Sequence, residues 1–216
     1  MRHRSSHILL IPALALLVGC SSHPLIEADP GLEMLTAVRP TATSALPDWV
    51  RRPGTYAGAK TGTEYFLGVG FPRETRVLAE RDAAARASAN IACAIGEIVA
   101  AKWQATQKGP FLPGRSVQKV VEELARDAIA RSATGGGTRV ELHLEPVDAR
   151  TRHGRALRVR AYALYATSPA QLFGIARRVP AQLDREVQLE PDAARQAPLK
   201  ALRSVIGSMT AKDFTF

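Results

Sequence analysis

The feature that most constrains this chain is a proline-free, alanine-rich segment that follows Pro72 and continues to about Thr106. Its apolar residues recur at steps of three and four, which indicates one face of a single long helix. At 1.5 Å per residue the helix would approach ~50 Å, which is long for a domain of this size. Its alanines allow another element to pack closely. The predicted apolar positions are Val77, Leu78, Ala84, Ser88, Ile91, Ile95, Ile98 and Val99.

The residues before this helix, YFLGVGFP at 65–72, outline a strand, a glycine turn and the start of a helix. A dinucleotide-binding fingerprint begins in the same way, but it needs a third glycine three positions after the second. That position holds Arg73, and the long helix occupies the region that would carry the ribose-binding acid. We therefore expect no cofactor. We interpret Gly68 and Gly70 as residues that let the strand end sharply and the helix pack back across it.

Further elements can be predicted downstream of the long helix. Ser116 is the predicted N-cap of a second helix with a clear apolar stripe. Two alternating segments, TRVELHLEP from Thr138 and ALRVRAYALYA from Ala156, predict an antiparallel hairpin with one buried face. Ser168 and Pro169 open a short final helix. This order predicts an α+β fold in one domain, with an antiparallel sheet packed on one face by the long helix and the second helix.

We place this domain at residues 47–179, after a signal peptide at 1–19 and a lipidated N-terminus with a flexible tether at 20–46. The remaining segment, 180–216, is predicted to be a C-terminal tail with an amphipathic helix from Pro198. The two helices and the hairpin already supply buried faces, so the core looks complete without this tail. We therefore expect its helix to dock on a partner or on a second copy. The stripe of the helix comprises Leu199, Leu202, Val205, Ile206 and Met209.

The N-terminus has the features of an export signal. Arg2 and Arg4 precede the short apolar run Ile8–Val18, which is typical of a secretory signal peptide and too short to span a bilayer. The run ends in LVGC at 17–20, which resembles the lipobox of bacterial lipoproteins; an ordinary signal peptide with a chance cysteine is the alternative. The resemblance implies cleavage before Cys20, diacylglycerol on its sulfur and a fatty acyl chain on the new amine, which together anchor a protein stably.

Lipid on Cys20 would place the protein in the cell envelope. By the same resemblance, Ser21 after the cysteine favours the outer membrane, on either its periplasmic or its surface face. Cys93 is the other of the two cysteines, so no intramolecular disulfide is expected in the lipidated protein. It lies in the apolar stretch NIACAIGEIV, where a small buried side chain is expected and a reactive thiol is the alternative.

The chain is basic, with a formal net charge of +9. Of its 29 Lys and Arg residues, two lie in the signal, which leaves 27 against 20 Asp and Glu, about +7. The turn and polar face of the predicted hairpin supply the candidate anion-binding residues Arg150, Arg152, Arg155, Arg158 and Arg160. One interpretation is a solvated hairpin, and the other is an edge that binds lipid phosphates or an acidic partner. Nucleic acid is not expected as a partner, because the chain is predicted to be exported.

No catalytic residues are predicted. The chain lacks a GxSxG elbow and an HExxH run, and the glycines at 135–137 follow a helix rather than open one. His143 stands between Glu141 and Glu145 on its strand and could hold a metal only with a further ligand. Exposed alternating charges are the simpler interpretation, so we expect no metal. We do not expect an enzyme.

Several short motifs occur in a familiar order: PDWV at 47–50, YFLGVGFP at 65–72, alanines at Ala79, Ala83 and Ala87, and then NIACAIGEIV. Together they resemble the twenty-kilodalton bacterial outer-membrane lipoprotein family, which takes in the flagellar assembly lipoprotein FlgP group. The resemblance covers residues 47 to about 99, and the late hairpin more loosely. It implies a non-enzymatic envelope protein with structural, flagellar or surface roles, which contacts other envelope proteins or itself. A binding module for envelope lipid or glycan is the alternative function.

Overall fold

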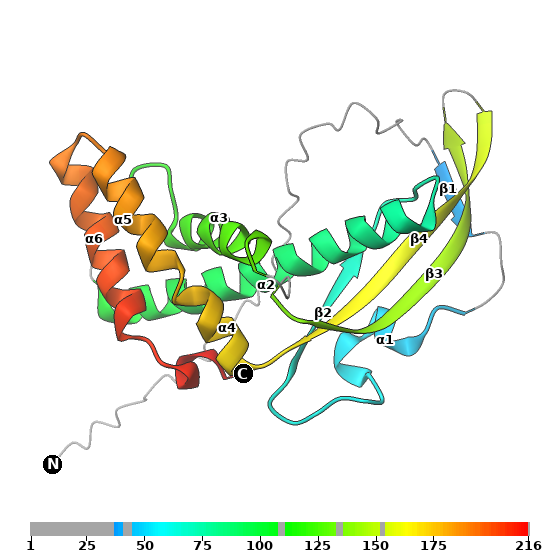
Figure 1. Ribbon diagram of the computed structural model, residues 1–216, viewed down its shortest axis with the longest axis horizontal. Coiled ribbons are helices and arrows are strands. Elements are labelled where there is room, and N and C mark those ends of the chain that lie inside the picture. The colour runs from blue at the N-terminus through cyan, green and yellow to red at the C-terminus, as the bar shows by residue number, and fades with distance from the viewer. Residues whose placement is uncertain (1–36, 41–44, 108–110, 133–135, 152–153, 216) are drawn as a thin grey trace, which may run out of the picture.

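The computed structural model describes residues 37–40, 45–107, 111–132, 136–151 and 154–215, and it shows an α+β domain (Figure 1). One antiparallel sheet has the strand order β1-β3-β4-β2, and the predicted fold class is confirmed. The strands are β1 (Ala37–Pro40), β2 (Glu64–Val69), β3 (Thr138–Thr151) and β4 (Gly154–Thr167).

The helices gather mainly at the end of the molecule away from the β3–β4 turn, and α2 crosses from one end to the other (Figure 1). The predicted long helix is present with nearly the expected bounds. The helical elements are α1 (Asp48–Arg51), η1 (Pro53–Thr55), α2 (Arg76–Thr106), α3 (Val117–Ala130), α4 (Pro169–Ala176), α5 (Val179–Leu189), α6 (Ala193–Ser208) and η2 (Ala211–Phe214).

Three helices begin where the sequence predicts, because each has a hydroxyl side chain that caps the free N–H groups of its first turn. Thr75 accepts from the backbone of Leu78 at the start of α2, and Ser116 caps α3 in the same way. Ser168 and Gln171 form a reciprocal capping box at α4, where Pro169 takes the first helical position.

The first half of α2 lies on the sheet through alanines. Ala79, Ala83 and Ala87 are fully buried, and the first two form a small cluster with alanines of β4. Val77 and Leu78, predicted on the buried face, are instead 75% and 44% exposed, so that part of the prediction is wrong. Large side chains do not identify the buried face here, because the helix approaches the strands closely and only small residues fit between them.

Strand β2 pairs with the half of β4 nearer the helices, and β1 pairs with the other end of β3, from Arg150 to Val147. β1 falls inside the predicted tether at 20–46, so that prediction is wrong for residues 37–40. Its four residues carry no alternation that would indicate a strand. Residues 1–36, which include the predicted signal peptide and Cys20, lie outside the described ranges.

The second half of α2 belongs to a larger core of aliphatic and aromatic side chains, shared with α3, α4, α5, α6 and η2. The C-terminal segment 180–216 is part of this core, which corrects the predicted domain boundary at residue 179. The expected amphipathic helix exists as α6, but its stripe faces the domain's own interior. The buried residues of the segment are Leu183, Leu199, Leu202, Val205, Ile206, Met209 and Phe214.

By length and composition α2 is the one helix in the described ranges that could cross a membrane, but 44% of its most apolar window is buried inside the protein. Ten of its residues are buried against the sheet or the other helices. We interpret α2 as the central helix of the folded domain, since its apolar side chains already contact protein.

Candidate functional site

The structure does not bring the predicted hairpin arginines together. Arg150 lies opposite Arg155 across the hairpin, while Arg158 lies opposite Val147. Neighbouring positions of a strand point to opposite faces, so Arg155 and Arg158, three positions apart, lie on different sides of the sheet. Arg160 shares the face of Arg158, and Arg152 lies outside the described residues. The predicted anion-binding edge is therefore divided between two faces.

Three of these arginines also have acidic partners. Arg155 lies 3.7 Å from Asp148, and Arg158 lies 2.5 Å from Glu74. Arg160 lies 3.8 Å from the nearly buried carboxylate of Glu145. An arginine that already neutralises a carboxylate attracts a second anion less strongly, so this hairpin is a weak candidate for anion binding.

A polar cluster on the sheet face opposite α2 has the features of a structural network. The hydroxyl of Tyr162 donates to Glu145 at 2.8 Å, and Arg160 contacts the same carboxylate oxygen. Burial, together with Glu145, raises the pKa of Tyr162, while Arg160 acts in the opposite direction. A phenol with a raised pKa stays protonated at neutral pH and remains a hydrogen-bond donor. The cluster therefore satisfies a buried carboxylate.

His143 lies on the same face as Glu141 and Glu145, as the alternation predicts. Its ring lies 5.9 Å from that of Tyr162, and Glu145 already accepts from Tyr162. Glu141 interacts with Tyr56, where it adds to desolvation in raising the pKa of that phenol. No group of three metal-binding side chains occurs in the part of the chain that the structure describes.

Gly68 and Gly70 have the packing role that we expected. A Cβ atom on Gly68 would lie 1.9 Å from the carbonyl oxygen of Ala83, and one on Gly70 would lie 2.6 Å from that of Ala79. The backbone of α2 therefore leaves no room for a side chain at either position. These two glycines allow the helix to lie directly on β2.

Cys93 is 4% exposed on the buried side of α2, as expected of a small apolar side chain. It is disulfide-bonded, and no cysteine in the described ranges is free. The expectation of no intramolecular disulfide is therefore not met.

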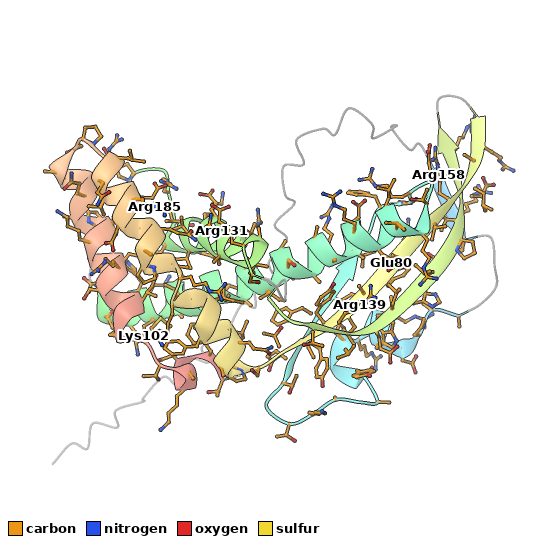
Figure 2. The ribbon with its side chains drawn as sticks, viewed as in Figure 1. Glu80, Lys102, Arg131, Arg139, Arg158 and Arg185 are labelled. Atoms are coloured by element: carbon orange, nitrogen blue, oxygen red, sulfur yellow. The ribbon has the colours of Figure 1, made fainter. Side chains whose placement is uncertain are left out.

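A cleft between α3 and α5 holds a group of arginines that the sequence analysis did not identify. It encloses ≈ 250 Å³ and is lined by Ala128, Arg131, Arg178, Ala181, Gln182 and Arg185. Arg131 and Arg185 lie on the same side of the helical end of the molecule (Figure 2). With its amide oriented to suit both neighbours, Gln182 donates to the carbonyl of Leu124 at 3.0 Å and accepts from Arg131. Arg131 is the C-cap of α3, whereas the other two arginines belong to α5, Arg178 at its N-cap and Arg185 seven positions later on the same helix face.

Comparison of the chain with known protein families, curated proteins and solved structures finds no match. The resemblance to the outer-membrane lipoprotein family therefore stays a prediction drawn from short motifs.

Proposed function

We propose that this chain is a non-enzymatic lipoprotein, anchored by lipid in the outer membrane, with a structural or assembly role through protein–protein contacts. The observation that carries the proposal is LVGC at 17–20, directly after the apolar run Ile8–Val18. The resemblance of residues 47–99 to the lipoprotein family is the reason for favouring a role in flagellar or surface structures.

The distance between the lipid and the folded domain fits an anchored protein. The 16 residues from Ser21 to Thr36 separate Cys20 from β1. A chain of that length can span at most ~55 Å. Strand β1 lies at the sheet end of the molecule, so an anchored domain would be held from that end (Figure 1).

The same end carries exposed apolar side chains that support a role in protein–protein contact. Val77 at the start of α2 is 75% exposed, and Leu157 on β4 is 71% exposed. Arg73 pairs with Val159, so the start of α2 lies next to this part of β4. Two large apolar side chains left this exposed at one end of the domain are candidates for contact with a partner.

Mass spectrometry of the protein from membranes tests the anchor. We expect a mature N-terminus at Cys20 with a thioether-linked diacylglycerol, and a Cys20→Ala variant should accumulate as the unprocessed precursor. A disulfide between Cys20 and Cys93 would use the same sulfur as the thioether, so the proposed anchor requires that Cys93, which is disulfide-bonded in the structure, be a free thiol in the mature lipidated protein. Finding that disulfide in the mature protein would exclude the lipid anchor.

Photo-crosslinking in intact cells tests the contact role. A photoreactive residue at Val77 or Leu157 should give discrete crosslinked products. The matched control is Leu189, which is 81% exposed on α5 at the other end of the molecule. Equal products from all three positions, or none, would contradict a specific contact at the sheet end.

The second candidate function is a binding module for envelope lipid or glycan. The arginine-lined cleft between α3 and α5 favours it, because an unpaired basic site is suited to a small anion rather than to a protein surface.

A further inference from the structure

We propose that the cleft between α3 and α5 binds a phosphate group, carried either by a small soluble molecule or by a lipid headgroup. Its lining combines Arg131, Arg178 and Arg185 with the amide of Gln182. The inference does not depend on lipid at Cys20, because it rests only on residues of the folded domain.

The first argument is that these arginines differ from the others of the helical half. Of the arginines in residues 117–132 and 168–208, Arg126, Arg195 and Arg203 have carboxylate partners, and Arg177 lies over the ring of Phe173. The remaining three all line the cleft. Within the described ranges, no carboxylate lies within 4.0 Å of any of their guanidinium groups.

The neighbouring acids do not neutralise the cleft. Asp184 of α5 pairs with Arg203 of α6 at 2.6 Å. Asp127 of α3 and Glu186 of α5 form no ion pair with a described residue. Three like charges around one cleft repel one another, and a bound anion would relieve that repulsion.

The second argument is the orientation of α5. Its first turn has no side-chain cap, and Ala181 of that turn lines the cleft. The N-terminal end of a helix carries a partial positive charge and suits an anion. The last turn of α3 adds a partial negative charge through Ala128, but three guanidinium groups outweigh it.

The third argument is the shape of the binding groups. Guanidinium groups donate in a planar fork that matches two oxygens of a phosphate, and several forks can share one phosphate. Gln182 holds Arg131 by accepting from it, so we infer that Gln182 is a positioning residue. Ala128 and Ala181 add small apolar surfaces beside the arginines, which suits a compact headgroup or a phosphorylated small molecule.

Calorimetric titration of the full chain, purified in a zwitterionic detergent, tests the proposal. The probes are glycerol 1-phosphate and short-chain phosphatidylglycerol, with short-chain phosphatidylcholine as the neutral-headgroup control. Arg178→Gln and Arg185→Gln should each weaken binding by about tenfold or more, as expected when a charge-assisted hydrogen bond is lost. Gln182→Leu should weaken it less, because it removes only the support of Arg131.

The matched control is Arg195→Gln, which removes the same charge from an exposed arginine of α6. Its affinity should stay within about twofold of the unmodified protein, because it lies outside the cleft. Binding of glycerol 1-phosphate would show that a soluble molecule with a phosphate group is sufficient to fill the cleft. Binding of phosphatidylglycerol alone identifies a lipid headgroup. Absence of saturable binding, or equal weakening by Arg195→Gln, would show general charge screening and would overturn the proposal.

Discussion

The two halves of α2 belong to two different kinds of core. Its first half meets the sheet through alanines, and the small cluster there comprises Ala79, Ala83, Ala161 and Ala163. Its second half meets the other helices through large side chains such as Ile91, Ile95 and Trp103. One helix therefore packs by close backbone approach at one end and by interlocking side chains at the other. The two ends should respond oppositely to a change of side-chain volume.

The largest test of this comparison is removal of residues 193–216. The deletion takes α6 and η2 from the helical core, including the fully buried Leu202 and Phe214. Full burial of each such side chain contributes ~1.5–3 kcal/mol, and a domain has only ~5–15 kcal/mol in total. We expect no cooperative unfolding transition by circular dichroism. A truncated protein with a native spectrum and a sharp transition would show that the sheet half folds alone.

A cavity made by truncating one buried side chain tests the packing of the helical half. Phe214 is fully buried, with its ring 5.9 Å from that of Phe173. Phe214→Ala should lower the free energy of unfolding by ~3–5 kcal/mol in urea denaturation. Leu189→Ala removes an 81% exposed side chain and should change it by less than ~0.5 kcal/mol. Equal effects of the two variants would contradict the assigned core.

One added methyl group should change the free energy of unfolding in opposite directions in the sheet half and in the helical half. Gly68→Ala places a Cβ 1.9 Å from the backbone carbonyl of Ala83, which cannot move without shifting α2. We expect a loss of ~1–3 kcal/mol, the range for an overpacked core. Gly207→Ala in α6 meets no atom within 4 Å and should stabilise the protein by ~0.4–1 kcal/mol. Thermal unfolding of both variants measures the difference. Stabilisation by Gly68→Ala would contradict the close contact between β2 and the backbone of α2.

The smallest expected effect depends on pH. Lys102 of α2 donates to Asp213 of η2 at 2.8 Å, which is the main cause that lowers the pKa of Asp213 to about 2. This pKa lies below the unfolded value of ~3.9, so the contribution to stability is present above pH ~4 and is lost as the pH falls toward 2. Urea denaturation should show that Asp213→Asn is destabilised at neutral pH and that the difference shrinks in acid. Lys102→Gln should reduce the same pH dependence, leaving the part that the hydrogen bonds from Thr210 supply, and an unchanged pH dependence would contradict the pairing.

The sequence predicts those parts of the fold whose signals are local. The proline-free segment after Pro72, the caps at Ser116 and Ser168 and the alternation of the hairpin identify three helices and two strands. The buried face of early α2 could not be read, because alanine is small enough to be common on either face of a helix. The role of α6 could not be read either, since an amphipathic stripe does not specify what covers it.

The candidate sites likewise could be predicted only where their residues are close together in the sequence. Proximity along the hairpin indicated a basic cluster, but strand alternation and ion pairs divide Arg155 from Arg158. Arg178 and Arg185 of the α3–α5 cleft lie seven positions apart on one face of α5, a spacing that the sequence does carry. Arg131 joins them from the end of α3, and no spacing in the sequence indicates that it belongs to the same site.

The position of η2 has a consequence for when the protein can fold. Lys102 and Asp213 are separated by 111 positions, and Phe214 beside Asp213 is fully buried in the core. Contacts so distant along the chain form late, because the intervening loop must close first. The helical core therefore stays incomplete until α6 and η2 have packed against the second half of α2, so the late step of folding is the arrival of this last hairpin of helices on a helix formed much earlier in the chain.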